Sequence, residues 1–146
     1  MSMSIDHPVT LVPQSGKMGC WSASISMLLG SRMTPGPGDA DTGPDGGMKP
    51  DVGNMQTLAR AYGLTLHPPH MSWAEWSLQE LVFRGPIMVC GRVPNGHCFV
   101  ISGVSGGNLH VLDPWPVGVG NDLWISYEQL MNRYPMATLY ILQRPW

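Results

Sequence analysis

The sequence predicts an α+β fold in which helices come first and an antiparallel sheet follows. Apolar residues recur at helical spacing in the first half of the chain, whereas the second half consists of short apolar runs separated by turn residues. Helices that precede a run of consecutive strands are typical of this class. The chain has 146 residues, so we expect one domain, 1–146. Its 18 glycines and 14 prolines predict many turns between these elements.

Helices are expected in the first half because apolar residues there fall on one helical face. Beginning at Cys20, the residues Trp21, Ile25 and Leu28 have this spacing, and Gly30 stands where a glycine commonly ends a helix. The other predicted helices are 55–62, between a cap at Asn54 and an end at Gly63, and 78–83, capped by Ser77 with Glu80 or starting earlier at Ser72 with Glu75.

Strands are expected in the second half, where apolar runs alternate with turns. The turn 105–108, with the sequence SGGN, joins two of these runs and predicts a hairpin. Ser126 can cap a last helix that runs through Arg133. The predicted strands are 64–66, 87–92, 97–104, 109–112, 124–126 and 137–143, and the segments expected to be extended or looped are 1–19 and 31–51.

Charge and hydropathy exclude several classes of protein. The net charge is −2 and no cluster of Lys or Arg occurs, so the electrostatic footprint of nucleic-acid binding is missing. No apolar run reaches the length that spans a bilayer. The first residues lack the basic and apolar regions of a signal peptide. We expect a protein that is cytoplasmic in the producing cell, or one that is exported by machinery that does not read such a signal.

Cys20, His97, Asp113 and Gln14 together have the residue types that a thiol hydrolase needs. Such an enzyme requires a thiolate, an imidazole beside it and donors for the oxyanion. The start of a helix favours a thiolate at Cys20, and Gln14 can donate to the same oxygen as the Cys20 backbone N–H. His97 begins one predicted strand and Asp113 ends the next, so the two meet in an antiparallel hairpin. We expect Cys20 as nucleophile, His97 as base and Asp113 as the group that orients the base.

Three motifs resemble those of papain-like cysteine peptidases. Gln14 followed by Cys20-Trp21 resembles their active-site entry, GHCFVISGV at 96–104 resembles the strand of their histidine, and DPWP at 113–116 resembles the segment that closes the site in compact bacterial members. The nearest likenesses are the avirulence-effector peptidases of plant-pathogenic bacteria and the bacteriocin-leader peptidase domains. The resemblance implies a papain-like fold, in which an N-terminal helix carrying the nucleophile packs on a C-terminal antiparallel sheet.

The resemblance also implies an activity. A cysteine peptidase or amidase of this kind acts on a peptide or protein through a Cys-His-Asp triad and needs no cofactor. The missing signal peptide fits a bacterial effector or toxin delivered by a route such as type VI secretion, and a cognate immunity protein would then be a partner. Deamidation of glutamine, or its cross-linking to an amine, can use the same site. A catalytically silent peptide-binding module is the alternative from another class.

Further residues favour structural roles. Three cysteines are too few for a disulfide framework, so we expect reduced thiols. Cys98 should point away from His97 on an alternating strand and lie in the core, as should Cys90. Trp115 is expected to shield the His97–Asp113 pair from water.

Metal sites are weakly indicated. His67 and His70 could bind zinc, but the segment that joins them is not helical, and the chain contains no CxxC motif. Asp39, Asp41 and Asp45 resemble the start of a calcium loop, but the third ligand and the terminal Glu of such a loop are missing. We expect no metal at either place.

Overall fold

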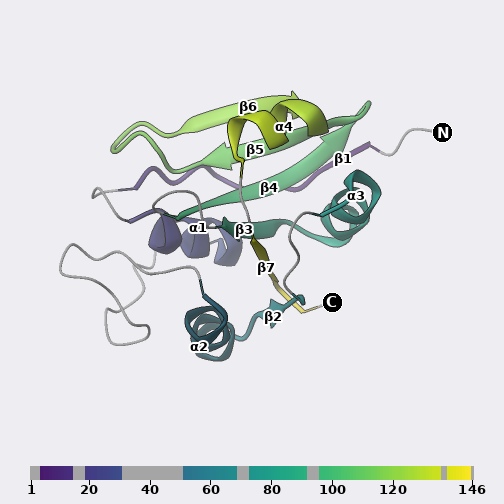
Figure 1. The fold of residues 1–146 in the computed structure, drawn as a ribbon. Coiled ribbons are helices and arrows are strands. Elements are labelled where there is room, and N and C mark those ends of the chain that lie inside the picture. Colours follow the sequence, from purple (N-terminus) through teal and green to yellow (C-terminus); the bar gives the residue numbers. More distant parts are fainter. Residues whose placement is uncertain are drawn as a thin grey trace.

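An antiparallel sheet lies between helices that cover both of its faces in the computed structural model (Figure 1). The α+β class predicted from the sequence is confirmed. The structure describes residues 4–14, 19–30, 51–68, 73–91, 96–135 and 138–145. Several predictions lie outside the described residues: the loop 31–50 with Asp39, Asp41 and Asp45, residues 15–18, His70, Ser72, and positions 92 and 137 of two strands.

Most of the sheet follows the first helices along the chain. The helices are α1 (Cys20–Leu29), α2 (Val52–Tyr62), α3 (Glu75–Arg84) and α4 (Tyr127–Arg133). The strands are β1 (Ser4–Asp6), β2 (Thr65–Leu66), β3 (Ile87–Gly91), β4 (His97–Ser105), β5 (Asn108–Asp113), β6 (Asn121–Ser126) and β7 (Leu139–Gln143). The strand order is β2-β7-β3-β4-β5-β6, and β1 also pairs with β4.

The helix that carries Cys20 has the predicted bounds. α1 begins at Cys20 and ends at Leu29, and its C-cap Gly30 has a φ of 71°, in the left-handed region that favours glycine. The N–H of Gly30 donates to the carbonyls of Met27 and Ser26, which closes the last turn. The predicted cap of α4 is also confirmed, since Ser126 and Gln129 form a capping box.

Two other predicted helix starts are wrong. α2 begins before Asn54, because the side chain of Asp51 accepts the N–H of Asn54 at 2.8 Å and so acts as the cap itself. α3 begins at residue 75 after Ala74, without a side-chain cap. Ser77 and Glu80 therefore lie inside α3 rather than at its start, and packing of its buried face replaces the expected capping box.

β1 is a strand where the sequence predicted only extended or looped chain. It pairs with the end of β4, and its residue Asp6 lies opposite Gly103. A Cβ at Gly103 would lie 2.5 Å from the Asp6 carboxylate and 2.7 Å from the Ile5 carbonyl oxygen, so only glycine permits this pairing. β1 matters for the site because the chain runs directly from it to Gln14.

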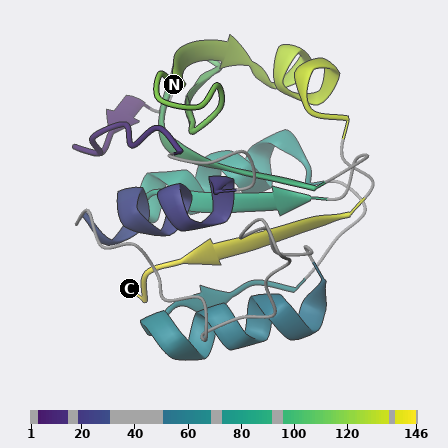
Figure 2. The ribbon, with the colours of Figure 1, turned by 90° about the vertical axis from the view of Figure 1, so that its left-hand side faces the viewer.

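The central strands are buried on both faces, which explains their continuous apolar runs. Ile87 and Val89 of β3 pack in the cluster that includes residues of α3 and α4, whereas Met88 and Cys90 pack in the cluster that includes residues of α1 and α2. Figure 2 shows α1 in front of the strands of the sheet. Within the described ranges, no helix is long and apolar enough to cross a bilayer.

His110 joins three strands at a distance from the predicted site. Its ring nitrogens lie 2.8 Å from the carboxylate of Asp6 on β1 and 2.6 Å from that of Asp122 on β6. Its ring also stacks on Trp124, with centroids 4.4 Å apart. Burial acts to lower the pKa of His110, but the two carboxylates outweigh it and raise the pKa above its ordinary value of 6.5.

The raised pKa of His110 predicts a pH-dependent contribution to stability. A group whose pKa is higher in the folded state stabilises the fold fully below its unfolded pKa, and loses this contribution as the pH rises through the folded value. The difference in free energy of unfolding between wild type and His110→Gln should therefore be larger near pH 5.5 than near pH 9.5. Chemical denaturation at both pH values measures this difference. An equal difference at both would contradict a stabilising interaction between protonated His110 and the two carboxylates.

Candidate active site

Cys20 occupies the first residue of α1, where the backbone favours an anion. Gly19 precedes it as the N-cap, so no capping side chain accepts the N–H groups of the first turn. Trp21 and Ile25 anchor α1 in the core against β3 and β4. The Cys20 side chain is only half-buried, so its sulfur can reach a substrate.

His97 and Asp113 form the hydrogen bond that the sequence predicts. His97 is the first residue of β4 and Asp113 the last of β5, and their Nε2 and Oδ1 atoms lie 2.8 Å apart. A carboxylate only accepts, so Nε2–H of His97 is the donor and Nδ1 is left for the thiol. Burial acts to lower the pKa of His97, but hydrogen bonds with Asp113 and Cys20 outweigh it and raise the pKa to about 9.

Asp113 is fixed by donors from three directions. Besides His97, the backbone N–H of Trp115 donates to Oδ1 at 2.9 Å and the hydroxyl of Tyr134 donates to Oδ2 at 2.5 Å. Burial acts to raise the pKa of the Asp113 carboxyl, but these hydrogen bonds lower it overall. The carboxylate therefore stays ionised although it is 3% exposed.

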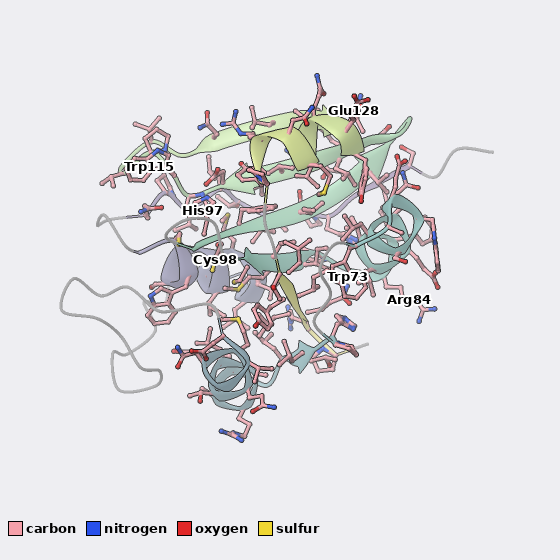
Figure 3. All side chains as sticks on the ribbon, viewed as in Figure 1. Trp73, Arg84, His97, Cys98, Trp115 and Glu128 are labelled. Atoms are coloured by element: carbon pink, nitrogen blue, oxygen red, sulfur yellow. The ribbon has the colours of Figure 1, made fainter. Side chains whose placement is uncertain are left out.

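The structure brings Cys20 to this pair. The Cys20 thiol is in hydrogen-bond contact with both His97 and Cys98, and Figure 3 shows His97 and Cys98 at the end of the sheet next to α1. The Cys98 thiol and burial raise the pKa of Cys20 and outweigh His97, which acts to lower it. Cys98 does lie in the core on the face opposite Phe99 and His97, as predicted, but its contact with Cys20 was not foreseen.

Gln14 is held by the loop that follows Asp113. Its N–H donates to the carbonyl of Pro114 and its carbonyl accepts from the N–H of Gly118, each at 3.0 Å. Gly120 lets the end of this loop lie against Asp113, since a Cβ there would lie 2.9 Å from the carbonyl oxygen of Asp113. The 2% exposed Gln14 side chain is thus placed by the same loop as the His97–Asp113 pair. Its role at the oxyanion stays a prediction.

Trp115 contributes differently from what was expected. Its backbone N–H donates to Asp113, but its side chain is 46% exposed and so does not cover the His97–Asp113 pair as expected.

Metal ligands are not assembled in the described part of the chain, where no group of three or more His, Cys, Asp or Glu has a suitable arrangement. His67 instead lies 3.0 Å from the side-chain oxygen of Gln143.

Tyr134 is a site residue that the sequence did not reveal. Its ring lies parallel to that of His97, with centroids 5.9 Å apart and an interplanar angle of 14°, and stacks on Phe99 at 4.3 Å. Burial and the charge of Asp113 raise the pKa of Tyr134, so the hydroxyl keeps its proton and donates. The residue follows α4 and precedes Pro135, and no local pattern distinguishes it from an ordinary helix end.

Removing the Tyr134 hydroxyl should lower the reactivity of Cys20 without abolishing it. Tyr134→Phe keeps both ring stacks but removes the donor to Asp113, and a hydrogen bond to a charged group is worth about 1.5–3 kcal/mol. We expect the rate of Cys20 alkylation to fall about tenfold or more. We also expect the pKa of Asp113 to rise, so the acid limb of the rate profile should move to higher pH. An unchanged limb would mean that Tyr134 serves packing alone.

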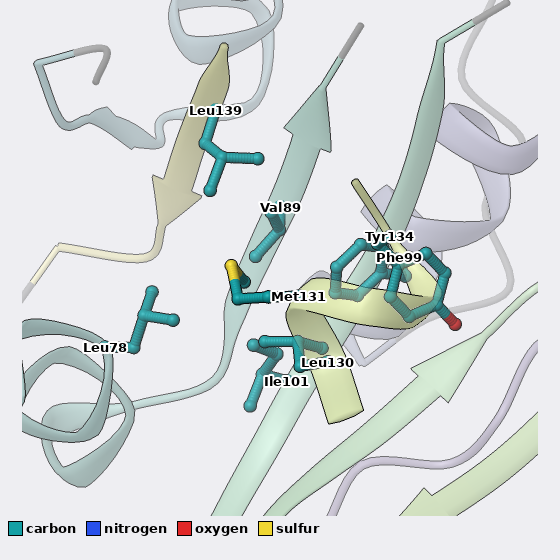
Figure 4. A pocket seen from close by; sticks show the side chains of 8 residues that line it. All are labelled: Leu78, Val89, Phe99, Ile101, Leu130, Met131, Tyr134 and Leu139. Carbon is teal, nitrogen blue, oxygen red and sulfur yellow. The ribbon is translucent and has the colours of Figure 1, made fainter. Parts of the chain in front are cut away.

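A small apolar cavity lies under α4 beside this ring (Figure 4). It has room for about 10 Å³, which is close to one water molecule. Its lining is formed by Leu78, Val89, Phe99, Ile101, Leu130, Met131, Tyr134 and Leu139. A substrate must therefore bind outside it, and the cavity is a gap in the packing behind Tyr134 and Phe99.

Comparison with known proteins decides the family. Residues 1–122 match the family model Peptidase_C70, described as papain-like cysteine protease AvrRpt2. The chain belongs to this family. It is accordingly a cysteine peptidase, and the predicted papain-like relationship is confirmed. No curated protein matches the chain at a significant level.

Solved structures resemble this AvrRpt2-family protease in fold. A double glycine motif protease from an AMS/PCAT transporter, in complex with the leader peptide, has a TM-score of 0.63 at 21% identity, with 99% of each chain covered. The peptidase domain of Streptococcus mutans ComA, in complex with a small-molecule inhibitor, has a TM-score of 0.59 at 16% identity, covering 91% of this chain and 98% of that one. A C39-like peptidase from Bacillus anthracis has a TM-score of 0.63 at 12% identity, with 98% of each chain covered.

Proposed function

We propose that this cysteine peptidase cleaves amide bonds of peptides by acyl transfer through Cys20, His97 and Asp113. The observation that carries the proposal is a continuous contact chain, in which Cys20 touches His97 and Nε2 of His97 lies 2.8 Å from Asp113. Nucleophile, base and orienting group are thereby within reach of one another, as acyl transfer by a thiol requires.

The two active-site ions stabilise each other. After Asp113, the Cys20 thiolate is the second group that raises the pKa of His97, and His97 in turn acts to lower the pKa of the thiol against the effects of Cys98 and burial. The thiolate attacks the carbonyl carbon, while the Cys20 N–H and the Gln14 amide donate to the oxyanion. His97 then gives its proton to the leaving amine. Water, deprotonated by His97, releases the acyl group and restores the thiol.

A peptide is the proposed substrate class. The structurally similar double glycine motif protease was solved with a leader peptide, which supports a peptide as the substrate of this chain as well. The test is incubation of the protein with a mixed peptide library that includes a double-glycine peptide, followed by mass spectrometry. New termini would support peptidase activity, whereas a gain of about one dalton at glutamine would mean deamidation on the same site.

Brief alkylation tests the site without a substrate. Iodoacetamide in limiting amount near pH 6 should modify Cys20 and leave Cys90 and Cys98 free, because only a thiolate reacts at this pH. The three cysteines differ in burial as well, so His97→Ala is the control: it keeps Cys20 in place but removes its partner. Equal labelling of Cys20 in both proteins would favour the catalytically silent module.

Gln14→Ala should lower turnover by about 10²–10³ if the side chain serves the oxyanion. The effect should fall on kcat rather than on KM, because the oxyanion exists only after attack. Gln129→Ala is a control, since that glutamine acts only as part of the α4 cap. A change confined to KM would place Gln14 in substrate binding instead.

Delivery into a target cell and a cognate immunity protein stay predictions from the sequence.

A further inference from the structure

The three free cysteines lie next to one another, in a row from the active site into the core. Cys98 on β4 is the register partner of Cys90 on β3. Its thiol is in hydrogen-bond contact with Cys90 on one side and with Cys20 on the other. All three pack in one apolar cluster with Trp21. The proposed nucleophile thus has a second thiol as its neighbour, in addition to His97.

The three cysteines differ in their access to solvent. Cys20 is half-buried, whereas Cys98 is 4% and Cys90 is 0% exposed. A small oxidant that arrives from solvent therefore meets Cys20 first. Cys20 also has His97 as a neighbour, which can take its proton and so form the thiolate that peroxide oxidises. Cys98 is placed to react with whatever forms on Cys20.

We propose that Cys20 and Cys98 are a redox pair, in which hydrogen peroxide oxidises Cys20 and Cys98 then closes a reversible disulfide with it. In the first step the Cys20 thiolate attacks the peroxide O–O bond, gives a sulfenic acid and releases water after protonation. In the second step the Cys98 sulfur attacks the Cys20 sulfur, forms the S–S bond and releases a second water. Two electrons pass from the two thiols to one peroxide.

The disulfide would switch the enzyme off and protect it. Bond formation draws the two sulfur atoms from contact to about 2 Å, and the Cys20 sulfur is then no longer a nucleophile. Without Cys98, further peroxide converts the sulfenic acid to a sulfinic acid that dithiols do not reduce. The consequence for catalysis rests on the proposed role of Cys20, whereas formation of the disulfide does not.

The sequence allows a direct test, because the three cysteines fall in three different tryptic peptides, 18–32, 85–92 and 93–133. The reduced full chain is treated with stoichiometric hydrogen peroxide, blocked with N-ethylmaleimide, and mapped without reduction. We expect peptides 18–32 and 93–133 to be joined, with a mass about two daltons below their sum. Peptide activity should be lost in parallel and return to its starting level with dithiothreitol.

Two variants distinguish the outcomes. Cys98→Ala should give no cross-link, and with two or more equivalents of hydrogen peroxide its Cys20 should gain about 32 daltons and lose activity irreversibly. Cys90→Ala, which removes an equally buried thiol one strand away, should behave like the wild type. A sulfinic acid on Cys20 in the wild type, or a link between 85–92 and 93–133, would overturn the proposal. A Cys20–Cys98 link in a protein with no activity at any stage would support the redox pair and count against the proposed function instead.

Discussion

Cys20→Ala is expected to abolish peptide cleavage, with a loss of about 10⁴-fold or more in kcat. The two residues that flank Cys20 cannot form the acyl-enzyme, because Trp21 is buried in the core and Gly19 has no side chain. The fold should survive, since the change removes one half-buried sulfur from a helix with good propensity for alanine. The free energy of unfolding should fall by about 1 kcal/mol.

The measurement pairs a turnover assay with thermal unfolding of the same preparations. Cys90→Ala is the matched control, because it removes a thiol that is fully buried on β3 and should leave turnover intact while costing stability. Turnover in Cys20→Ala within tenfold of wild type would contradict the acyl-enzyme mechanism. A protein that has lost both activity and cooperative unfolding would require Cys20→Ser, which preserves the size of the side chain.

The site was predictable where function depends on local sequence. The bounds of α1 follow from the spacing of Trp21 and Ile25 and from Gly30, and the His97–Asp113 bond follows from the hairpin around the SGGN turn. Both inferences need only short-range regularity, namely helical period and strand alternation.

Long-range contacts could not be predicted in the same way. Tyr134 reaches Asp113 only because α4 folds back over the sheet, and Cys98 reaches Cys20 only because α1 packs against β4. β1 depends on the missing Cβ of Gly103, about a hundred residues away along the chain. The cap at Asp51 was missed for a local reason. Val52 and Gly53 are weak helix formers, so the first turn of α2 does not look helical in the sequence.

His97→Ala is expected to lower turnover by about 10³–10⁴, because it removes both the base and the cation that supports the thiolate. Asp113→Ala should cost less, since the imidazole would still reach Cys20. Asp113→Asn is the more informative change, because it keeps the volume at a buried position and one acceptor oxygen in place of two. It removes the charge, which is one of the causes that raise the pKa of His97, and puts an amide donor where one of the carboxylate oxygens accepts.

The pH profile should then separate orientation from charge. Burial alone pushes the pKa of His97 down, and Asp113 is the first of the groups that raise it to about 9. If the imidazolium is needed for attack, activity of the wild type should persist until the pH approaches this value and then fall as His97 loses its proton. In Asp113→Asn the pKa of His97 must drop, so the alkaline limb of kcat/KM should move to lower pH.

Asp122→Asn supplies the matched control for this shift. It removes a carboxylate from a different histidine, His110, which lies outside the contact chain of Cys20, His97 and Asp113. Its alkaline limb should stay where the wild type has it, although its stability at acid pH should fall. An alkaline limb that moves equally in both variants would reflect the net charge of the protein. A limb that moves in neither would mean that Asp113 acts on His97 through geometry alone, because removing its charge then changes the rate without changing the protonation of the ring.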